Sequence, residues 1–193
     1  MASKNSMSHY GAAVIGLHWL MLLLLAAVYA SMELRGLAPK GSDLRNALKP
    51  LHFLLGLSVL AFVIVRLAVR WRAGAAPDIH PPLPPWQDRL ARLMHWALYA
   101  FMLATPVLGW MTLSAEGKPI VLLGLHVPLL IGANERLADQ LKDVHEALAT
   151  AGYFLIGLHA AAALFHHYIT HDNTLVRMLP KMAQDRKSTR NNS

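Results

Sequence analysis

The sequence predicts an all-α integral membrane protein built as a four-helix bundle. Of its 193 residues, 55% are hydrophobic and only 15% are charged, against a usual charged fraction of about 25%. Four long apolar segments are almost free of Asp, Glu, Lys and Arg. Each has about the 20 residues that a helix needs to cross the bilayer core, so we expect four membrane spans. Disorder and an ordinary soluble domain are both disfavoured.

The spans belong to one predicted domain over residues 1–180, and a polar cytoplasmic tail follows over 181–193. Their expected limits are about 12–32, 50–70, 92–114 and 145–170. The first apolar stretch is too long for the core of a cleaved signal peptide, so we interpret it as a span. Pro106, inside the third span, is tolerable in a membrane helix.

A fifth uncharged run, residues 119–134, is short and is interrupted by Gly124, Pro128 and Gly132. We interpret it as an interfacial or re-entrant segment, with a fifth span as the less favoured alternative. Residues 135–146 then carry apolar side chains at helical spacing. This pattern predicts an amphipathic lead-in that is continuous with the fourth span.

The distribution of basic residues predicts the orientation. Eleven of the 18 Lys and Arg fall at the N-terminus, around the loop between spans two and three, and in the tail, and seven fall on the other side. The positive-inside rule therefore predicts that both termini are cytoplasmic. The net charge of +7 is then a topology signal with anionic lipid as its partner, and nucleic-acid binding is not indicated. The cytoplasmic loop includes 77–85 (PDIHPPLPP), which predicts a stiff, non-helical connector.

The chain has no cysteine. Disulfides, thiolate metal sites, iron–sulfur clusters and covalent c-type haem attachment are therefore excluded.

Histidines inside the apolar spans are the candidate functional residues, because ionisable groups within a membrane are costly and usually functional. His145 and His159 are 14 residues apart, nearly four helical turns, so they share one helix face about 21 Å apart. Gly152 lies midway on that face, where a missing side chain lets a flat macrocycle lie close.

Each of these histidines has a counterpart at the depth expected for it. His52 starts the second span on the outer side, as His145 starts the fourth, and His18 lies near the inner end of the first span, as His159 does in the fourth. Imidazole is an axial ligand of haem iron, so the pairs predict two stacked bis-histidine haem sites. Gly56, one turn after His52, would relieve crowding there.

Three other interpretations remain open at this point. The histidines could make polar contacts between helices, form a zinc site, or form a proton relay. Zinc is less favoured, because its sites gather three or four ligands, often with carboxylate or thiolate among them.

Several motifs resemble the bacterial cytochrome b561 family over about residues 10–180. They are 152–164 (GYFLIGLHAAAAL), His166-His167-Tyr168, 172–178 (DNTLVRM), His18-Trp19, 32–36 (MELRG), and Leu141-Lys142 ahead of His145-Glu146. Within that family the motifs are nearest to the di-haem members that oxidise superoxide and reduce ubiquinone.

The resemblance implies an enzyme of the bacterial inner membrane that holds two haem b groups through the same four histidines. It implies electron transfer from superoxide outside to ubiquinone near the cytoplasmic haem, with no protein partner required. It carries a quinone contact to His166, which lies two turns beyond His159 on the same face. An interfacial histidine meeting lipid headgroups is the alternative for His166.

Basic residues beside the outer span ends, Arg35, Lys49 and Lys142, would attract a small anion such as superoxide and bind haem propionates. Of these, Arg35 and Lys142 are the expected steering residues, and ordinary span-flanking charge is the alternative. His95 is expected to be a core hydrogen-bonding residue, a spare ligand or a quinone contact, and the sequence assigns no role to His126 or His167.

Two other functions stay open. Related cytochromes anchor hydrogenases or dehydrogenases and pass electrons from the partner subunit to quinone. A haem-free, histidine-rich transporter is the third possibility.

Overall fold

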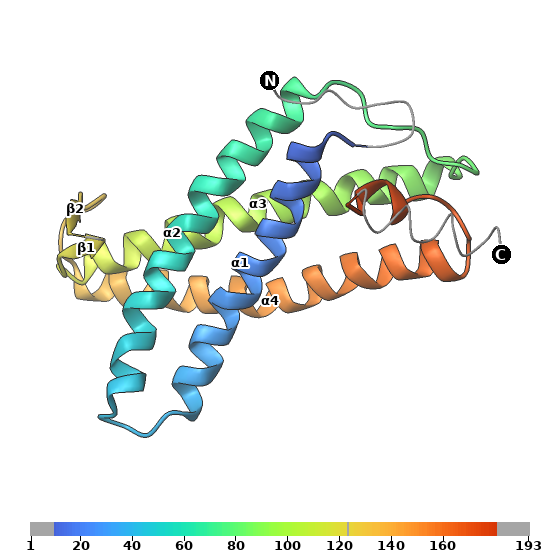
Figure 1. Cartoon of the computed structure of the whole chain (residues 1–193). Coiled ribbons are helices and arrows are strands. Elements are labelled where there is room, and N and C mark those ends of the chain that lie inside the picture. Colours follow the sequence, from blue (N-terminus) through green and yellow to red (C-terminus); the bar gives the residue numbers. More distant parts are fainter. Residues whose placement is uncertain (1–9, 123, 181–193) are drawn as a thin grey trace. The chain divides into compact units, whose positions relative to one another are not determined.

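A computed structural model describes residues 10–122 and 124–180 of the chain. Most of the described residues lie in long helices, which Figure 1 labels α1 to α4. The elements are, in order, α1 (Ala12–Leu37), α2 (Asp43–Arg72), α3 (Pro85–Ala115), β1 (Ile120–Leu122), β2 (Leu125–Val127), α4 (Glu135–Tyr168) and the 3-10 helix η1 (Val176–Met178). All four long helices are long and apolar enough to cross a membrane, which confirms the predicted fold class.

The helices α2 and α3 begin earlier than the predicted spans. Apolar composition marks the part of a helix that lies in the membrane, and it does not mark where the helix starts. In α2, Ser42 precedes the first turn and its hydroxyl accepts a hydrogen bond from the Arg45 amide at 3.3 Å. Such an N-cap starts a helix, and Asp43 in the first turn complements the helix dipole. The α3 helix starts at Pro85, the first-turn position that suits proline.

The lead-in predicted over residues 135–146 is part of α4, which is one uninterrupted helix of 34 residues. It starts after Asn134, whose side-chain oxygen accepts a hydrogen bond from the Leu137 amide at 3.0 Å. This is again N-cap geometry.

Within 119–134 the described residues include two short antiparallel strands, β1 and β2, and no helix, and Val121 pairs with His126. Gly124 occupies the turn with a positive φ of 82°, which glycine adopts without strain. The following loop is tied to the end of α3, because Trp110 donates to the Pro128 carbonyl oxygen and the Leu130 amide donates to the Ser114 hydroxyl.

The chain forms two compact units, and each draws a segment from all four long helices. The central unit consists of Met21–Val63 and Leu98–Phe154. The described part of the terminal unit consists of residues 10–20, 64–97 and 155–180.

The core of the central unit is formed by Met21, Val59, Val63 and Met102, which are all at most 7% exposed. Few other large apolar side chains on the helices are buried. Leu23, for example, is 67% exposed and Phe154 is 76% exposed. A helix surface this apolar is suited to lipid contact and unsuited to water.

The terminal unit joins the connector before α3 to the segment after α4. Asn173 makes three hydrogen bonds to the connector: its amide and side chain donate to the carbonyls of His80 and Asp78, and its side-chain oxygen accepts from the His80 amide. The buried Arg177 donates to the Pro77 carbonyl oxygen. The connector is non-helical up to Pro84, as its prolines predict.

Candidate functional site

Two histidines come together in the central unit. The rings of His52 on α2 and His145 on α4 have centroids 6.2 Å apart and planes at 83°. The Nδ1 of His145 lies 2.9 Å from the Thr105 carbonyl oxygen, and the Nδ1 of His52 lies 3.3 Å from that of Val28. A carbonyl can only accept, so both Nδ1 atoms are protonated and both Nε2 atoms keep a lone pair for a metal ion.

A second pair forms in the terminal unit. The ring centroids of His18 on α1 and His159 on α4 are 6.3 Å apart, with planes at 72°. His95 on α3 also approaches His159, at 5.5 Å, and its Nδ1 lies 2.6 Å from the Ala91 carbonyl oxygen. The structure therefore brings together the histidine pairs that the sequence predicted and adds His95 beside one of them.

These separations test whether the residues fit haem. Two imidazoles that bind one metal ion from opposite sides, each through a bond of about 2 Å, hold their ring centroids about 6 Å apart. Both pairs have this spacing. Among residues 10–122 and 124–180, no three His, Asp or Glu side chains form a metal-binding group. The donor set therefore fits an axially ligated haem better than zinc.

Glycines border the central pair. A side chain at Gly109 on α3 would bring its Cβ to 3.1 Å from Cε1 of His145, so glycine gives the imidazole room to lie against α3. A Cβ at Gly56, one turn after His52, would meet no atom within 4 Å, so this glycine faces open space. Gly152 instead faces protein atoms, since its Cβ would come within 2.2 Å of the Tyr29 hydroxyl and 2.5 Å of Phe101. Haem packing against Gly56 and Gly152 remains a prediction.

Arg66 on α2 belongs to the terminal site, although its sequence position indicated only a topology charge. Its Nη2 donates to the His18 Nδ1 at 3.1 Å, and its buried Nη1 has no hydrogen-bond partner in the described part of the chain. Because a guanidinium only donates, this contact leaves the hydrogen of the neutral His18 ring on Nε2, and iron binding through Nε2 would require Arg66 to release the ring. A buried cationic nitrogen without a partner is costly, so this position suits an anionic group such as a haem propionate. An arginine within the apolar run was the signal that could have identified it.

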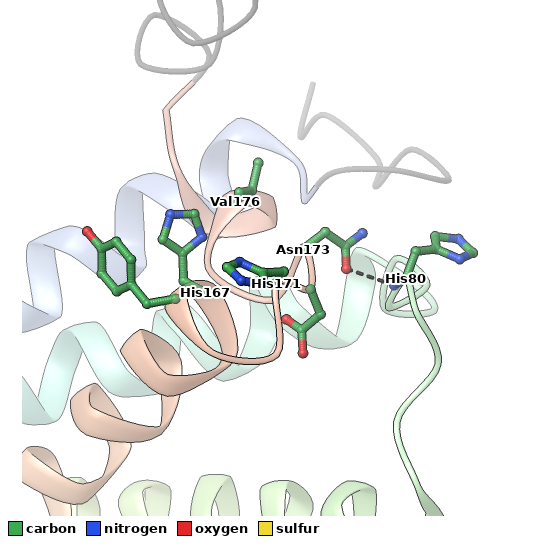
Figure 2. A pocket seen from close by; sticks show the side chains of 7 residues that line it. His80, His167, His171, Asn173 and Val176 are labelled. Atoms are coloured by element: carbon green, nitrogen blue, oxygen red, sulfur yellow. Dashed lines mark hydrogen bonds between the residues drawn. The ribbon is translucent and has the colours of Figure 1, made fainter. Parts of the chain in front are cut away.

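His166 is held by a buried carboxylate near the end of α4. Its Nδ1 lies 2.6 Å from the Asp172 Oδ2, and the Asp172 side chain is only 1% exposed. Burial raises the pKa of Asp172, but hydrogen bonds from Thr174 and His166 outweigh this effect and hold the pKa below its usual range. A neighbouring pocket has a volume of about 470 Å³. Figure 2 shows His80, His167 and His171 among the side chains that line it.

The predicted outer basic residues separate in the structure. Arg35 lines a pocket of about 450 Å³ in the central unit together with Arg45, Lys49 and Lys118. Lys142 is not among the lining residues. It lies on the exposed surface of α4, with its Nζ 3.9 Å from Glu146.

Four membrane-spanning helices with facing imidazoles define an integral membrane protein of the haem-binding, electron-transfer class. The chain belongs to the prokaryotic cytochrome b561 family, whose members it matches over residues 9–181. Membership implies a b-type haem cofactor, an oxidoreductase function and a multi-pass position in the bacterial inner membrane.

Curated relatives agree with this assignment. The chain is 43% identical over 175 residues to Cytochrome b561 homolog 1 of Escherichia coli K12, which covers 91% of this chain and 99% of the relative. It is 41% identical over 172 residues to a Yersinia pestis protein named "Probable superoxide oxidase CybB", which covers 89% of this chain and 96% of the relative. Cytochrome b561 homolog 2 of Escherichia coli K12 is 30% identical over 189 residues, 96% of this chain and 98% of the relative.

Proposed function

We propose that this protein carries two haem b groups, oxidises superoxide at the periplasmic face of the inner membrane and reduces ubiquinone near the cytoplasmic face. The proposal rests mainly on one observation: histidine rings come together in two pairs, with ring centroids 6.2 Å apart in one pair and 6.3 Å apart in the other. The similarity to a relative named as a probable superoxide oxidase supports the choice of donor.

Each pair would hold one haem, His52 with His145 and His18 with His159. When bound, a haem supplies one-electron redox chemistry. The carbonyl oxygens of Val28 and Thr105 orient the rings of the first pair and keep each Nε2 available. Arg66 would neutralise a propionate beside His18, since its Nη1 lacks a partner among the described residues.

The basic pocket of the central unit is the proposed entrance for superoxide. Arg35, Arg45, Lys49 and Lys118 line it, and Lys49 lies one helical turn before His52 on α2. A concave surface lined by one sign of charge concentrates small ions of the opposite sign. The steering residues we propose are therefore Arg35, as the sequence indicated, and Lys49 and Lys118, with Lys142 contributing only from the surrounding surface.

The proposed orientation of the protein in the membrane follows from its basic residues, whose distribution predicts that both termini are cytoplasmic. His166 then lies toward the cytoplasmic end of α4. Its imidazole can hydrogen-bond a carbonyl oxygen of ubiquinone and pass a proton to it. One ubiquinone takes two electrons and two protons, so each turnover consumes two superoxide ions and releases two molecules of oxygen.

The test uses the purified full-length chain in detergent. We expect two haems per chain and haem reduction by enzymatically generated superoxide that superoxide dismutase abolishes. Added ubiquinone-1 should then be reduced to the quinol. One haem or none would contradict the two-site proposal. A chain that is reduced only by a co-purifying dehydrogenase would instead be a membrane-anchor cytochrome.

A further inference from the structure

We propose that Asp172 is a positioning residue that orients His166 as the proton donor to ubiquinone. The inference rests on the proposed quinone reduction and adds the path of its protons. It starts from a carboxylate that is buried at the end of α4 and faces an imidazole.

The Asp172 carboxylate is fully engaged. Its Oδ2 lies 2.6 Å from the His166 Nδ1, and its Oδ1 accepts a hydrogen bond from the Thr174 amide at 2.8 Å. The Asp172 amide also donates to the His166 carbonyl oxygen at 3.1 Å. The backbone and the side chain therefore both hold these two residues together.

This contact selects one tautomer of His166. An ionised carboxylate can only accept, so Nδ1 carries the hydrogen and Nε2 is left for another partner. Within the described residues no hydrogen bond reaches the Nε2 of His166. Nε2 is therefore the atom available to a quinone oxygen.

The same contact places a buried negative charge beside the ring that donates the proton. A buried carboxylate beside a histidine stabilises the positive ring, as an orienting aspartate does in hydrolase triads. Other charges nearby are the buried Arg177 and, from the connector, Asp78, which lies close enough to interact with Arg177. The histidines of the bordering pocket, His80, His167 and His171, are the remaining titratable groups at this end of the unit.

Each proton transfer leaves His166 neutral and the quinone oxygen protonated. The Nε2–H bond of protonated His166 breaks, an O–H bond forms on the quinone oxygen, and Asp172 stays ionised. The neutral ring then takes a new proton from cytoplasmic water through the pocket in Figure 2, which Asp172 also lines. Two such transfers accompany the two electrons that two superoxide ions supply.

The experiment compares wild type with Asp172→Asn and Asp172→Glu, using purified haem-loaded protein. Haem is first reduced with dithionite, the remaining dithionite is removed, and reoxidation of the haem by ubiquinone-1 is followed by stopped flow between pH 5.5 and 9. We expect Asp172→Asn to slow reoxidation about tenfold or more. The pH above which the reoxidation rate declines should also be lower in this variant. Asp172→Glu should restore part of both effects. Haem content and superoxide-driven haem reduction should not change.

Asp88→Asn is the matched control, because Asp88 forms an exposed ion pair with Arg92 on α3. His166→Ala should be as slow as Asp172→Asn, and the double variant should be no slower than either. A uniform slowing with an unchanged pH profile would overturn the proposal and indicate a structural role. Unchanged kinetics in Asp172→Asn would overturn it as well.

Two further results separate this proposal from the proposed function. If the reduced wild-type protein does not react with ubiquinone, the proposed function and the role of Asp172 both fail. If the wild type reacts and Asp172→Asn reacts at the same rate, only the role of Asp172 is overturned. Should Asp172→Asn not fold, ¹⁵N-histidine NMR of wild type decides. A hydrogen on Nδ1 of His166 supports the proposal, and a neutral ring with its hydrogen on Nε2 overturns it.

Discussion

The hydroxyl group of Tyr29 reaches the backbone of α4 only because residue 152 is glycine. It donates a 2.7 Å hydrogen bond to the Ala149 carbonyl oxygen, and a Cβ at Gly152 would lie 2.2 Å from the Tyr29 hydroxyl oxygen. Tyr29 also contacts the Tyr153 ring at a centroid distance of 4.2 Å, and the Tyr153 hydroxyl donates to Glu33. Glycine thus permits close packing of α1 against α4 inside the central unit.

Gly152→Ala should therefore destabilise the protein by about 1–3 kcal/mol, the usual cost of overpacking. Thermal unfolding followed by circular dichroism measures the loss. Gly157→Ala on the same helix is the matched control, because its Cβ meets no atom within 4 Å, and it should be neutral or slightly stabilising. Equal effects of the two substitutions would contradict the packing argument.

His145→Ala should leave one haem per chain, held by His18 and His159, because the two pairs belong to separate units. Haem content and the reduced absorption spectrum measure this. His52→Ala should leave the same residual spectrum, whereas His18→Ala and His159→Ala should share a different one. His126→Ala, an exposed position in β2, should retain both haems. Any other grouping of the four spectra would refute the proposed pairing.

Lys49→Glu combined with Lys118→Glu should slow haem reduction by superoxide about tenfold at low salt and weaken its dependence on ionic strength. Arg35→Glu with Lys142→Glu should act in the same direction, mainly through Arg35, which lines the pocket. Lys40→Glu, an exposed change outside the pocket, is the control. If all of these variants react at the wild-type rate, electrostatic steering through this pocket is wrong.

Arg66→Gln should lower the midpoint potential of one haem by on the order of 50 mV, because a buried cation favours the form that carries an extra electron. A spectroelectrochemical titration would show one transition moving while the other stays. Arg72→Gln, exposed at the end of the same helix, should shift neither. An unchanged potential in Arg66→Gln would mean that this guanidinium acts only on the ring of His18.

The lowered pKa of Asp172 predicts how stability changes with pH. A carboxyl group whose pKa is lower in the folded state stabilises the fold fully above its unfolded pKa of about 3.9, and loses this effect as the pH falls through the folded value. Asp172→Asn should therefore be less stable than wild type at pH 7 by about 1.5–3 kcal/mol. The difference in stability between wild type and Asp172→Asn should disappear below about pH 4. Unfolding temperatures of both proteins, measured from pH 3 to 7, test this. A difference that does not change with pH would contradict a role for the carboxylate.

Much of the fold was predictable, because an apolar stretch of some 20 residues has one stable form in a bilayer. The helical period also predicted which histidines share a face of α4, and the structure brings His52 to His145 and His18 to His159. The ends of α2 and α3 were not predictable from hydropathy, since their first turns are polar and depend on caps.

Contacts between distant residues were missed for a different reason. Neither the room that Gly109 gives to His145 nor the approach of Arg66 to His18 has a local sequence pattern. The Asp172–His166 contact needs the chain to turn back after α4, and periodicity does not describe such a turn. The strands β1 and β2 were not predicted, because they are too short to carry a periodic pattern, and the sequence indicated only an interfacial or re-entrant segment there.

The Trp19 side chain, next to His18, donates a hydrogen bond to the carbonyl oxygen of Met178 at 2.8 Å. The unit that holds His18 thus joins residues 10–20, 64–97 and 155–180 in its described part, whereas the unit of His52 and His145 consists of residues 21–63 and 98–154. A substitution that loosens the segment around Met178 should therefore disturb the surroundings of His18 and His159, while the unit of His52 and His145 contains none of that segment.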